Sequence, residues 1–132
     1  MENILETIPN ASSISQVNDF MENILQSVNV PLKISTKLCV AVDEIYSNVV
    51  HYSGAKKAGI HFIHENDCVK VIVWDDGVEF NPLLNKNPDT SLSAEERPIG
   101  GLGIYMTKQM MDSVAYEYKD NLNYFTMTKN IV

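Results

Sequence analysis

The sequence predicts an α/β two-layer sandwich, in which helices cover one face of a mixed, mostly antiparallel sheet. Two long segments space their apolar residues as amphipathic helices do, and five shorter segments read as half-buried strands. Their order along the chain is strand, helix, helix, strand, strand, loop, helix, strand, strand. At 132 residues the chain has the length of one domain, and we expect residues 1–132 to form a single one.

The first part of the chain is expected to hold one strand and the two long helices. Residues 3–8 form the strand, and Ser12 or Ser13 is expected to cap the helix that follows. The apolar stripe of that helix is Ile14, Val17, Phe20, Met21, Ile24, Leu25 and Val28. Pro31 marks the start of the second helix, residues 32–53. The apolar stripe of the second helix is Ile34, Leu38, Val42, Ile45, Val49 and Tyr52.

The remaining elements are shorter. In chain order they are expected as strands at 60–65 and 68–75, a helix at 102–111, and strands at 113–119 and 123–131. Residues 77–101 interrupt this series with a stretch rich in Pro, Asn, Asp, Ser and Glu. A loop of that length inside a compact domain is usually a functional lid or a disordered segment.

Composition argues against several classes of partner. The net charge is −7 and no cluster of Lys and Arg is present, whereas nucleic-acid binding depends on basic contacts to phosphates. Cys39 and Cys68 lie far apart without a CxxC pair, which indicates free thiols rather than a zinc site or a disulfide framework. No leader-like segment opens the chain and no apolar run approaches membrane-spanning length, so we expect a cytoplasmic protein without a membrane partner.

The stretch "RPIGGLGIYM", residues 97–106, places three glycines within four positions. It lacks the GK[ST] of a P-loop, and it is a poor dinucleotide-binding fingerprint because a long loop precedes it and a third, spaced glycine is missing. What remains is a glycine-rich turn at a helix N-terminus, where free N–H groups and the helix dipole favour an anion. A flexible start of a helix without any ligand explains the glycines equally well.

Two other stretches carry polar groups that suit a binding site. In "VWDDGVEFNP" an apolar strand ends at Asp75, whose carboxylate suits an exocyclic amine, while Gly77 leaves room for a flat ring; a plain turn is the alternative. In "AVDEIYSNVVHYS" the i, i+4 pair Glu44 and Asn48 shares one helical face at the border between core and cleft. Its carboxylate suits a general base and its amide oxygen suits Mg²⁺, although an isolated pair of this kind is usually a polar helix edge.

The order of these motifs, ExxxN, then DxG, then GGLG, resembles the Bergerat fold, the ATP-binding domain of gyrase-type topoisomerases, histidine kinases and mismatch-repair ATPases. More narrowly, the chain resembles the anti-sigma-factor serine/threonine kinases of bacteria, above all in "ERPIGGLGIYMTKQMMD". The resemblance covers nearly the whole chain. It implies that the protein binds ATP or ADP together with Mg²⁺.

The resemblance also implies a role for individual residues. Asn48 is expected to coordinate the Mg²⁺ that bridges the nucleotide phosphates, and Glu44 to be the general base. Asp75 is expected to bind the adenine amino group, with Gly77 beneath the ring. The backbone N–H groups that face the phosphates are then those of Gly101, Leu102 and Gly103, and residues 97–100 belong to a mobile ATP lid.

The chain departs from the family pattern at two places. Glu79 stands where a second glycine is common, so its charge opposes phosphate binding if it points inward and is harmless if it points to solvent. In the last strand, where relatives often place a threonine near the adenine, this chain has Asn123, with Thr126 nearby.

The function implied is a kinase that phosphorylates a STAS-type anti-anti-sigma partner and sequesters a sigma factor, usually as a homodimer. The alternative is an ATP-gated binding module of the same fold with little or no phosphotransfer. Glu44 favours the kinase, because a pure binder needs no base beside Asn48. The catalytic half of a histidine kinase is less favoured, because no helix with a phosphoacceptor histidine is expected before the first strand.

Overall fold

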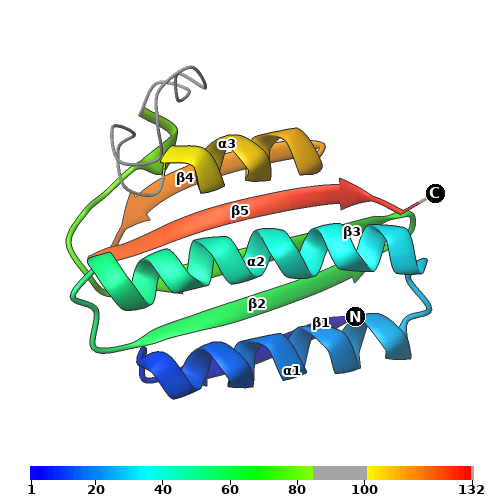
Figure 1. The fold of residues 1–132 in the computed structure, drawn as a ribbon, viewed down its shortest axis with the longest axis horizontal. Helices are drawn as coiled ribbons and strands as arrows, with labels where there is room; N and C mark the ends of the chain where they lie inside the picture. The colour runs from blue at the N-terminus through cyan, green and yellow to red at the C-terminus, as the bar shows by residue number, and fades with distance from the viewer. Residues whose placement is uncertain (85–100, 132) are drawn as a thin grey trace.

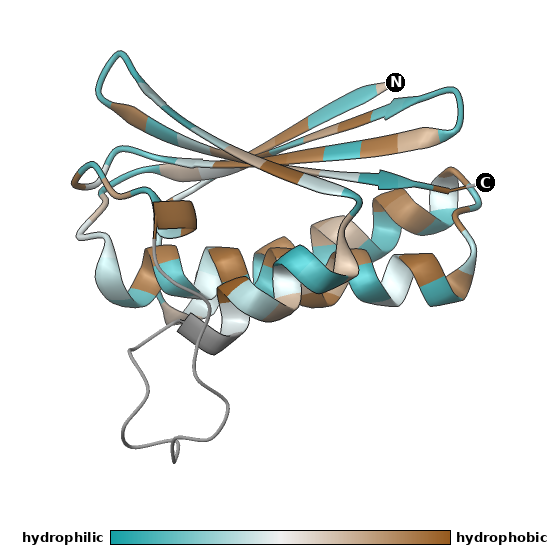
Figure 2. Ribbon diagram, turned by 90° about the horizontal axis from the view of Figure 1, so that it is seen from above, coloured by the Kyte–Doolittle hydropathy of each residue, from teal (hydrophilic) through white to brown (hydrophobic). Residues whose placement is uncertain are grey.

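The structure, a computed structural model, describes residues 1–84 and 101–131. Five strands form one sheet in the order β1-β2-β3-β5-β4, and three helices pack against one of its faces (Figures 1 and 2). In chain order the elements are β1 (Glu2–Thr7), α1 (Ala11–Ser27), α2 (Leu32–Tyr52), β2 (Ala58–Glu65), β3 (Cys68–Asp75), the 3₁₀ turn η1 (Pro82–Leu84), α3 (Gly101–Met110), β4 (Ser113–Lys119) and β5 (Leu122–Asn130).

The expected two-layer arrangement with helices on one face is confirmed. All four pairings between the described strands are antiparallel, so the sheet has no parallel pair in this part of the chain and is not mixed there. Antiparallel pairing follows from the short turns that join β2 to β3 and β4 to β5. Among the described helices, none combines the length and apolarity needed to cross a membrane.

The cap of α1 differs from the prediction. Asn10, rather than Ser12 or Ser13, is the N-cap: its Oδ1 accepts from the backbone N–H of Ser13 at 2.9 Å. Ser13 is the third helical residue, and its Oγ accepts in return from the Asn10 N–H at 3.0 Å. This reciprocal pair satisfies two backbone N–H groups at once, which a serine cap further along the chain does not achieve.

The core lies between the helix layer and the sheet. Its largest fully buried side chains are Tyr46, Phe62, Met21, Leu25, Leu38, Ile60, Met127, Val17, Val42, Val69, Val71 and Val73. The Tyr46 hydroxyl joins three elements, because it lies 2.6 Å from Thr7 Oγ1 of β1 and 2.7 Å from Ser13 Oγ of α1. Tyr52, predicted to belong to the apolar stripe, is 58% exposed, because it occupies the last turn of α2 at the mouth of a cavity.

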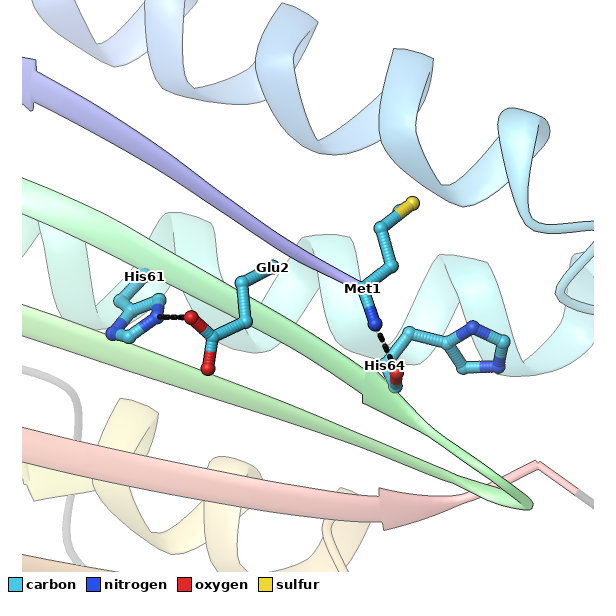
Figure 3. Close-up of polar contacts among 4 residues, drawn as sticks. All are labelled: Met1, Glu2, His61 and His64. Carbon is cyan, nitrogen blue, oxygen red and sulfur yellow. Dashed lines mark hydrogen bonds and ion pairs between the residues drawn. The ribbon is translucent and has the colours of Figure 1, made fainter.

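The N-terminal strand is attached along the outer edge of the sheet. The N-terminal amino group of Met1 donates to the His64 carbonyl at 2.9 Å, and Glu2 Oε2 lies 3.6 Å from His61 Nε2 of β2 (Figure 3). These contacts hold β1 in register with β2, with Glu2 opposite Ile63.

The register between β3 and β5 positions the site described next. Asp75, the last residue of β3, lies opposite Asn123 of β5. Alternation along β5 turns Asn123, Phe125 and Met127 toward the helices, where all three are buried. Thr126 therefore lies on the other face of the sheet, away from Asn123.

Candidate functional site

A cavity of about 330 Å³ opens where the C-terminal end of α2 meets the end of β3. That volume is at the lower end of the range for small-molecule sites. Its apolar walls are Ile45, Val49, Val78, Phe80, Pro82, Ile104 and Phe125. Its polar groups come from Asn48, Tyr52, Ser53, Asp75, Tyr116 and Asn123. Such a mostly apolar cleft with a few polar groups suits a flat, partly polar ring.

Asp75 supplies a buried carboxylate at the edge of this cavity, and it is only 5% exposed. Its Oδ1 accepts from the Gly77 N–H at 2.8 Å and from Asn123 Nδ2 at 3.2 Å. No side chain or backbone group in the described part of the chain donates to Oδ2, which leaves that oxygen for a ligand donor. Burial raises the pKa of Asp75, while these two hydrogen bonds lower it and the neighbouring Asp76 raises it.

Gly77 is required by a close approach between two segments. A Cβ at this position would lie 2.5 Å from the Ser53 carbonyl oxygen and 2.8 Å from Ser53 Cβ. Val78 N also donates to the Ser53 carbonyl, at 3.3 Å. Gly77 itself does not line the cavity. The glycine therefore lets the turn after β3 lie against the end of α2, a different reason from the space for a ring that the sequence suggested.

Glu44 and Asn48 lie one turn apart on α2, and both are half-buried, as their spacing predicts. Asn48 lines the cavity, whereas Glu44 lies beside it and packs against Gly103 of α3. Burial raises the pKa of Glu44, and the charge of Asp43 raises it further. A carboxylate with a raised pKa at the edge of a cleft is suited to accepting a proton at neutral pH.

The glycine-rich motif begins α3. Gly101 and Leu102 are the first two residues of the helix, which starts one residue earlier than predicted. Ile104, in the same first turn, reaches the cavity wall. The expected lid residues 97–100 lie outside the described residues. Glu79 is exposed and does not line the cavity.

Several residues of the site were not singled out from the sequence, among them the apolar wall residues Val78, Phe80 and Pro82 and two polar ones. Tyr116 of β4 and Ser53 after α2 both line the cavity, and each looks ordinary in its own segment. Strand order alone brings Tyr116 close, because β4 lies next to β5. Asn123, which the sequence analysis placed in the last strand without assigning it a partner, forms a hydrogen bond with Asp75.

Among the described residues, the cavity offers too few protein ligands to hold a metal ion on their own. The described residues contain no group of three or more His, Cys, Asp or Glu side chains able to hold a metal ion. The Asn48 carboxamide offers a single oxygen ligand to the cavity. That donor set fits Mg²⁺ carried by a nucleotide, because Mg²⁺ is commonly held by few protein groups together with phosphates and water.

A comparison of sequences matches residues 9–129 to one family, the histidine kinase-like ATPase domain. Among curated proteins, the chain is similar to the serine/threonine-protein kinase BtrW of Bordetella bronchiseptica, with 22% identity over 130 residues that cover 96% of this chain and 92% of the relative. It is also similar to the serine-protein kinase RsbW of Bacillus cereus, with 31% identity over 99 residues that cover 70% of this chain and 61% of the relative.

Solved structures share the fold at lower identity. The RsbU and RsbW domains of a Mycobacterium tuberculosis protein superpose with a TM-score of 0.69 and 12% identity, covering 98% of this chain and 32% of the other. The SiaB–SiaC complex of Pseudomonas aeruginosa gives a TM-score of 0.63 and 13% identity, covering 96% of this chain and 88% of the other. At these identities the likeness describes the fold alone.

Proposed function

The chain belongs to the histidine kinase-like ATPase domain family, and we propose that it is an ATP-dependent serine/threonine protein kinase that acts as an anti-sigma regulatory factor. The single observation that carries the choice of nucleotide is the end of β3. There Asp75 lines a mostly apolar cavity, and its Oδ2 accepts no hydrogen bond from the described residues. The exocyclic amino group of adenine can donate a hydrogen bond to that carboxylate. A base with a carbonyl oxygen at the same position would set one acceptor against another, so adenine is favoured.

The residues around the cavity suggest how the nucleotide is held. Asp75 accepts a hydrogen bond from the adenine amino group, and the apolar wall at Val78 and Phe80 covers the ring and excludes water. The Asn48 carboxamide oxygen holds Mg²⁺ that arrives with the phosphates. The start of α3, with its free backbone N–H groups, offers the positive end of the helix dipole to the phosphates.

Phosphoryl transfer consists mostly of positioning and charge neutralisation. Bound Mg²⁺ neutralises charge on the phosphate oxygens during transfer. Glu44, one turn from Asn48, accepts the proton of the attacking serine or threonine hydroxyl. Its raised pKa, caused by burial, keeps it a stronger base than an exposed glutamate.

The proposal extends to partners and place of action. We propose a STAS-type anti-anti-sigma protein as the phosphoacceptor and a sigma factor as the second partner, with the kinase acting as a homodimer in the cytoplasm. The resemblance in sequence motivates these assignments. The SiaB–SiaC structure supports only the first of them, a protein partner, because it contains a neighbour of the same fold in complex with another protein. We also propose that residues 1–132 form one domain.

Two measurements test this function. Calorimetry with ATP and Mg²⁺ should show binding by the wild-type protein, and ATP should raise its melting temperature by mass action. Incubation with γ-labelled ATP and a STAS-type partner should transfer label to a serine or threonine of the partner, located by mass spectrometry. Absence of ATP binding would contradict the whole assignment. ATP binding with a bound but never labelled partner would instead support an ATP-gated binding module.

A further inference from the structure

Asn123 is buried, at 6% exposed, and both the oxygen and the nitrogen of its carboxamide make hydrogen bonds. Its Nδ2 donates to Asp75 Oδ1 at 3.2 Å and to the Val78 carbonyl at 2.9 Å. Its Oδ1 accepts from the Phe80 N–H at 3.1 Å and from the Tyr116 hydroxyl at 2.5 Å. The Asn123 side chain therefore links the Asp75 carboxylate, the wall of the cavity and strand β4.

The orientation of this carboxamide is fixed by the backbone. The Phe80 N–H can only donate, and the Val78 carbonyl can only accept, so Oδ1 faces Phe80 and Nδ2 faces Val78. Given that orientation, Nδ2 also meets Asp75 Oδ1 as a donor. The reversed amide would place its oxygen against both the Val78 carbonyl and the Asp75 carboxylate, two acceptors to which it could donate no proton.

We propose that Asn123 is a positioning residue of the nucleotide site: it holds Asp75 by Oδ1 so that Oδ2 serves the adenine amino group, and it seats the Val78–Phe80 wall. Tyr116 secures Asn123 from the neighbouring strand. This inference rests on the proposed function and deepens it, because it assigns the residues that align Asp75 for its ligand.

Tyr116 is suited to act as the permanent donor in this arrangement. Burial raises the pKa of Tyr116, a hydrogen bond with the Phe80 backbone lowers it, and the nearby charges of Glu79 and Asp75 raise it again. The phenol therefore keeps its proton at neutral pH and donates to Asn123 Oδ1 without competition from its ionised form. In the described part of the chain, Asp75 and Tyr116 bond to Asn123, Tyr118 lies opposite it and Tyr52 lines the same cavity. The charge of Asp76 acts on Asp75, and that of Glu79 acts on Tyr116.

The sharpest test is the isosteric change Asn123→Asp. It replaces the Nδ2 donor with a carboxylate oxygen facing Asp75 Oδ1. Two carboxylates at this distance share one proton, and the pair releases that shared proton at a pH well above the ordinary pKa of a carboxyl group. At high pH the pair repels, and Asp75 loses its alignment. At lower pH the shared proton restores a donor to Asp75. We expect the ratio of ATP dissociation constants, variant over wild type, to exceed about tenfold near pH 8 and to shrink as pH falls toward about 5.5.

The ratio is the quantity to measure, because protonation of the nucleotide affects both proteins alike. Circular dichroism at each pH confirms that both proteins are folded. A ratio near one, or a large ratio that does not change with pH, overturns the positioning role, because a purely structural loss has no reason to recover as the pair gains a proton. Failure of the wild type to bind ATP contradicts the proposed function itself and removes the ligand on which this inference rests.

A second variant decides the matter if Asn123→Asp does not fold. Tyr116→Phe removes only the hydroxyl that donates to Asn123, and we expect ATP binding to weaken about 3- to 10-fold. Tyr118→Phe is the matched control, because Tyr118 lies directly opposite Asn123 in the β4–β5 register and makes no hydrogen bond to it. Wild-type affinity in Tyr116→Phe, or equal losses in both tyrosine variants, overturns the proposal.

Discussion

Glu44 of α2 packs against Gly103 of α3 so closely that a Cβ at position 103 would overlap the Glu44 carboxylate. The contact joins two motifs that lie 59 positions apart, the ExxxN helix and the GGLG turn. This contact explains why position 103 is a glycine by a reason other than space for phosphates: a side chain there would displace Glu44, the proposed base. Alignment of Glu44 therefore depends on the packing of α2 against α3.

Gly103→Ala should destabilise the protein and impair phosphotransfer. The added methyl overlaps the carboxylate end of the Glu44 side chain, which is half-buried and must move aside, and a displaced rotamer of this kind costs about 0.5–1.5 kcal/mol of unfolding free energy. Urea denaturation measures this cost. In the Glu44→Ala background the overlap is gone, so the same Gly103→Ala change should be neutral, or stabilising by up to about 1 kcal/mol through helix propensity. Equal destabilisation in both backgrounds would show that Glu44 is not what excludes a side chain at position 103.

Glu44→Gln should separate binding from chemistry. The amide keeps the size of the side chain and loses the base, so ATP affinity measured by calorimetry should stay close to that of the wild type. Transfer from γ-labelled ATP to the partner should slow by about 10²–10⁴-fold. Asn48→Ala is the informative comparison, because loss of the proposed Mg²⁺ ligand should weaken Mg²⁺-dependent ATP binding and activity together. Unchanged transfer by Glu44→Gln would remove Glu44 as the base.

The rate of phosphoryl transfer should depend on pH through the ionisation of Glu44. Burial, followed by the charge of Asp43, raises the pKa of Glu44, and a general base works only when ionised. The rate at saturating ATP should therefore rise with pH across the raised pKa, at higher pH than an ordinary glutamate near about 4.3 would give. Glu44→Gln should lack this rise. An identical rise in both proteins would assign it to another group.

Asp75→Asn should weaken ATP binding without weakening the fold. The amide places either a neutral oxygen or an N–H at the position of Oδ2, the proposed acceptor for adenine, and loss of a charged acceptor should weaken ATP binding about 10- to 100-fold. Burial raises the pKa of Asp75, so the ionised carboxylate is less stable in the folded protein than in the unfolded chain. Its ionisation therefore lowers the free energy of unfolding as the pH rises toward that raised pKa. At neutral pH the variant should thus unfold at the same or a higher urea concentration. Asp67→Asn, in the β2–β3 hairpin, controls for loss of a distant charge.

Asn10→Ala should test the corrected helix cap. Loss of the side-chain acceptor for the Ser13 N–H should lower the unfolding free energy by about 1 kcal/mol. Ser15→Ala, at an exposed position of the same helix, should change it little. Equal effects of the two substitutions in urea denaturation would argue against Asn10 as the cap.

The periodicity of apolar residues and the order of the motifs predict most of the helices and strands from the sequence alone. The i, i+4 spacing of Glu44 and Asn48 placed both on one half-buried edge of a helix, because helical geometry is local. Alternating residues placed β3 and ended it at Asp75. The cap of α1 was mistaken because asparagine and serine are nearly equal as caps, and only the bonds actually formed distinguish Asn10 from its neighbours.

Tertiary structure alone decided which distant groups meet at the site. The strand order β1-β2-β3-β5-β4 inserts the last strand beside β3, which brings Asn123 to Asp75 across 48 residues of sequence. The register then decides the face, and a slip of one residue would have turned Asn123 away and Thr126 inward. Likewise, the packing of α3 on α2 sets Gly103 against Glu44. Such contacts depend on the free energy of the whole packed sheet and helix layer, which no single segment of the sequence contains.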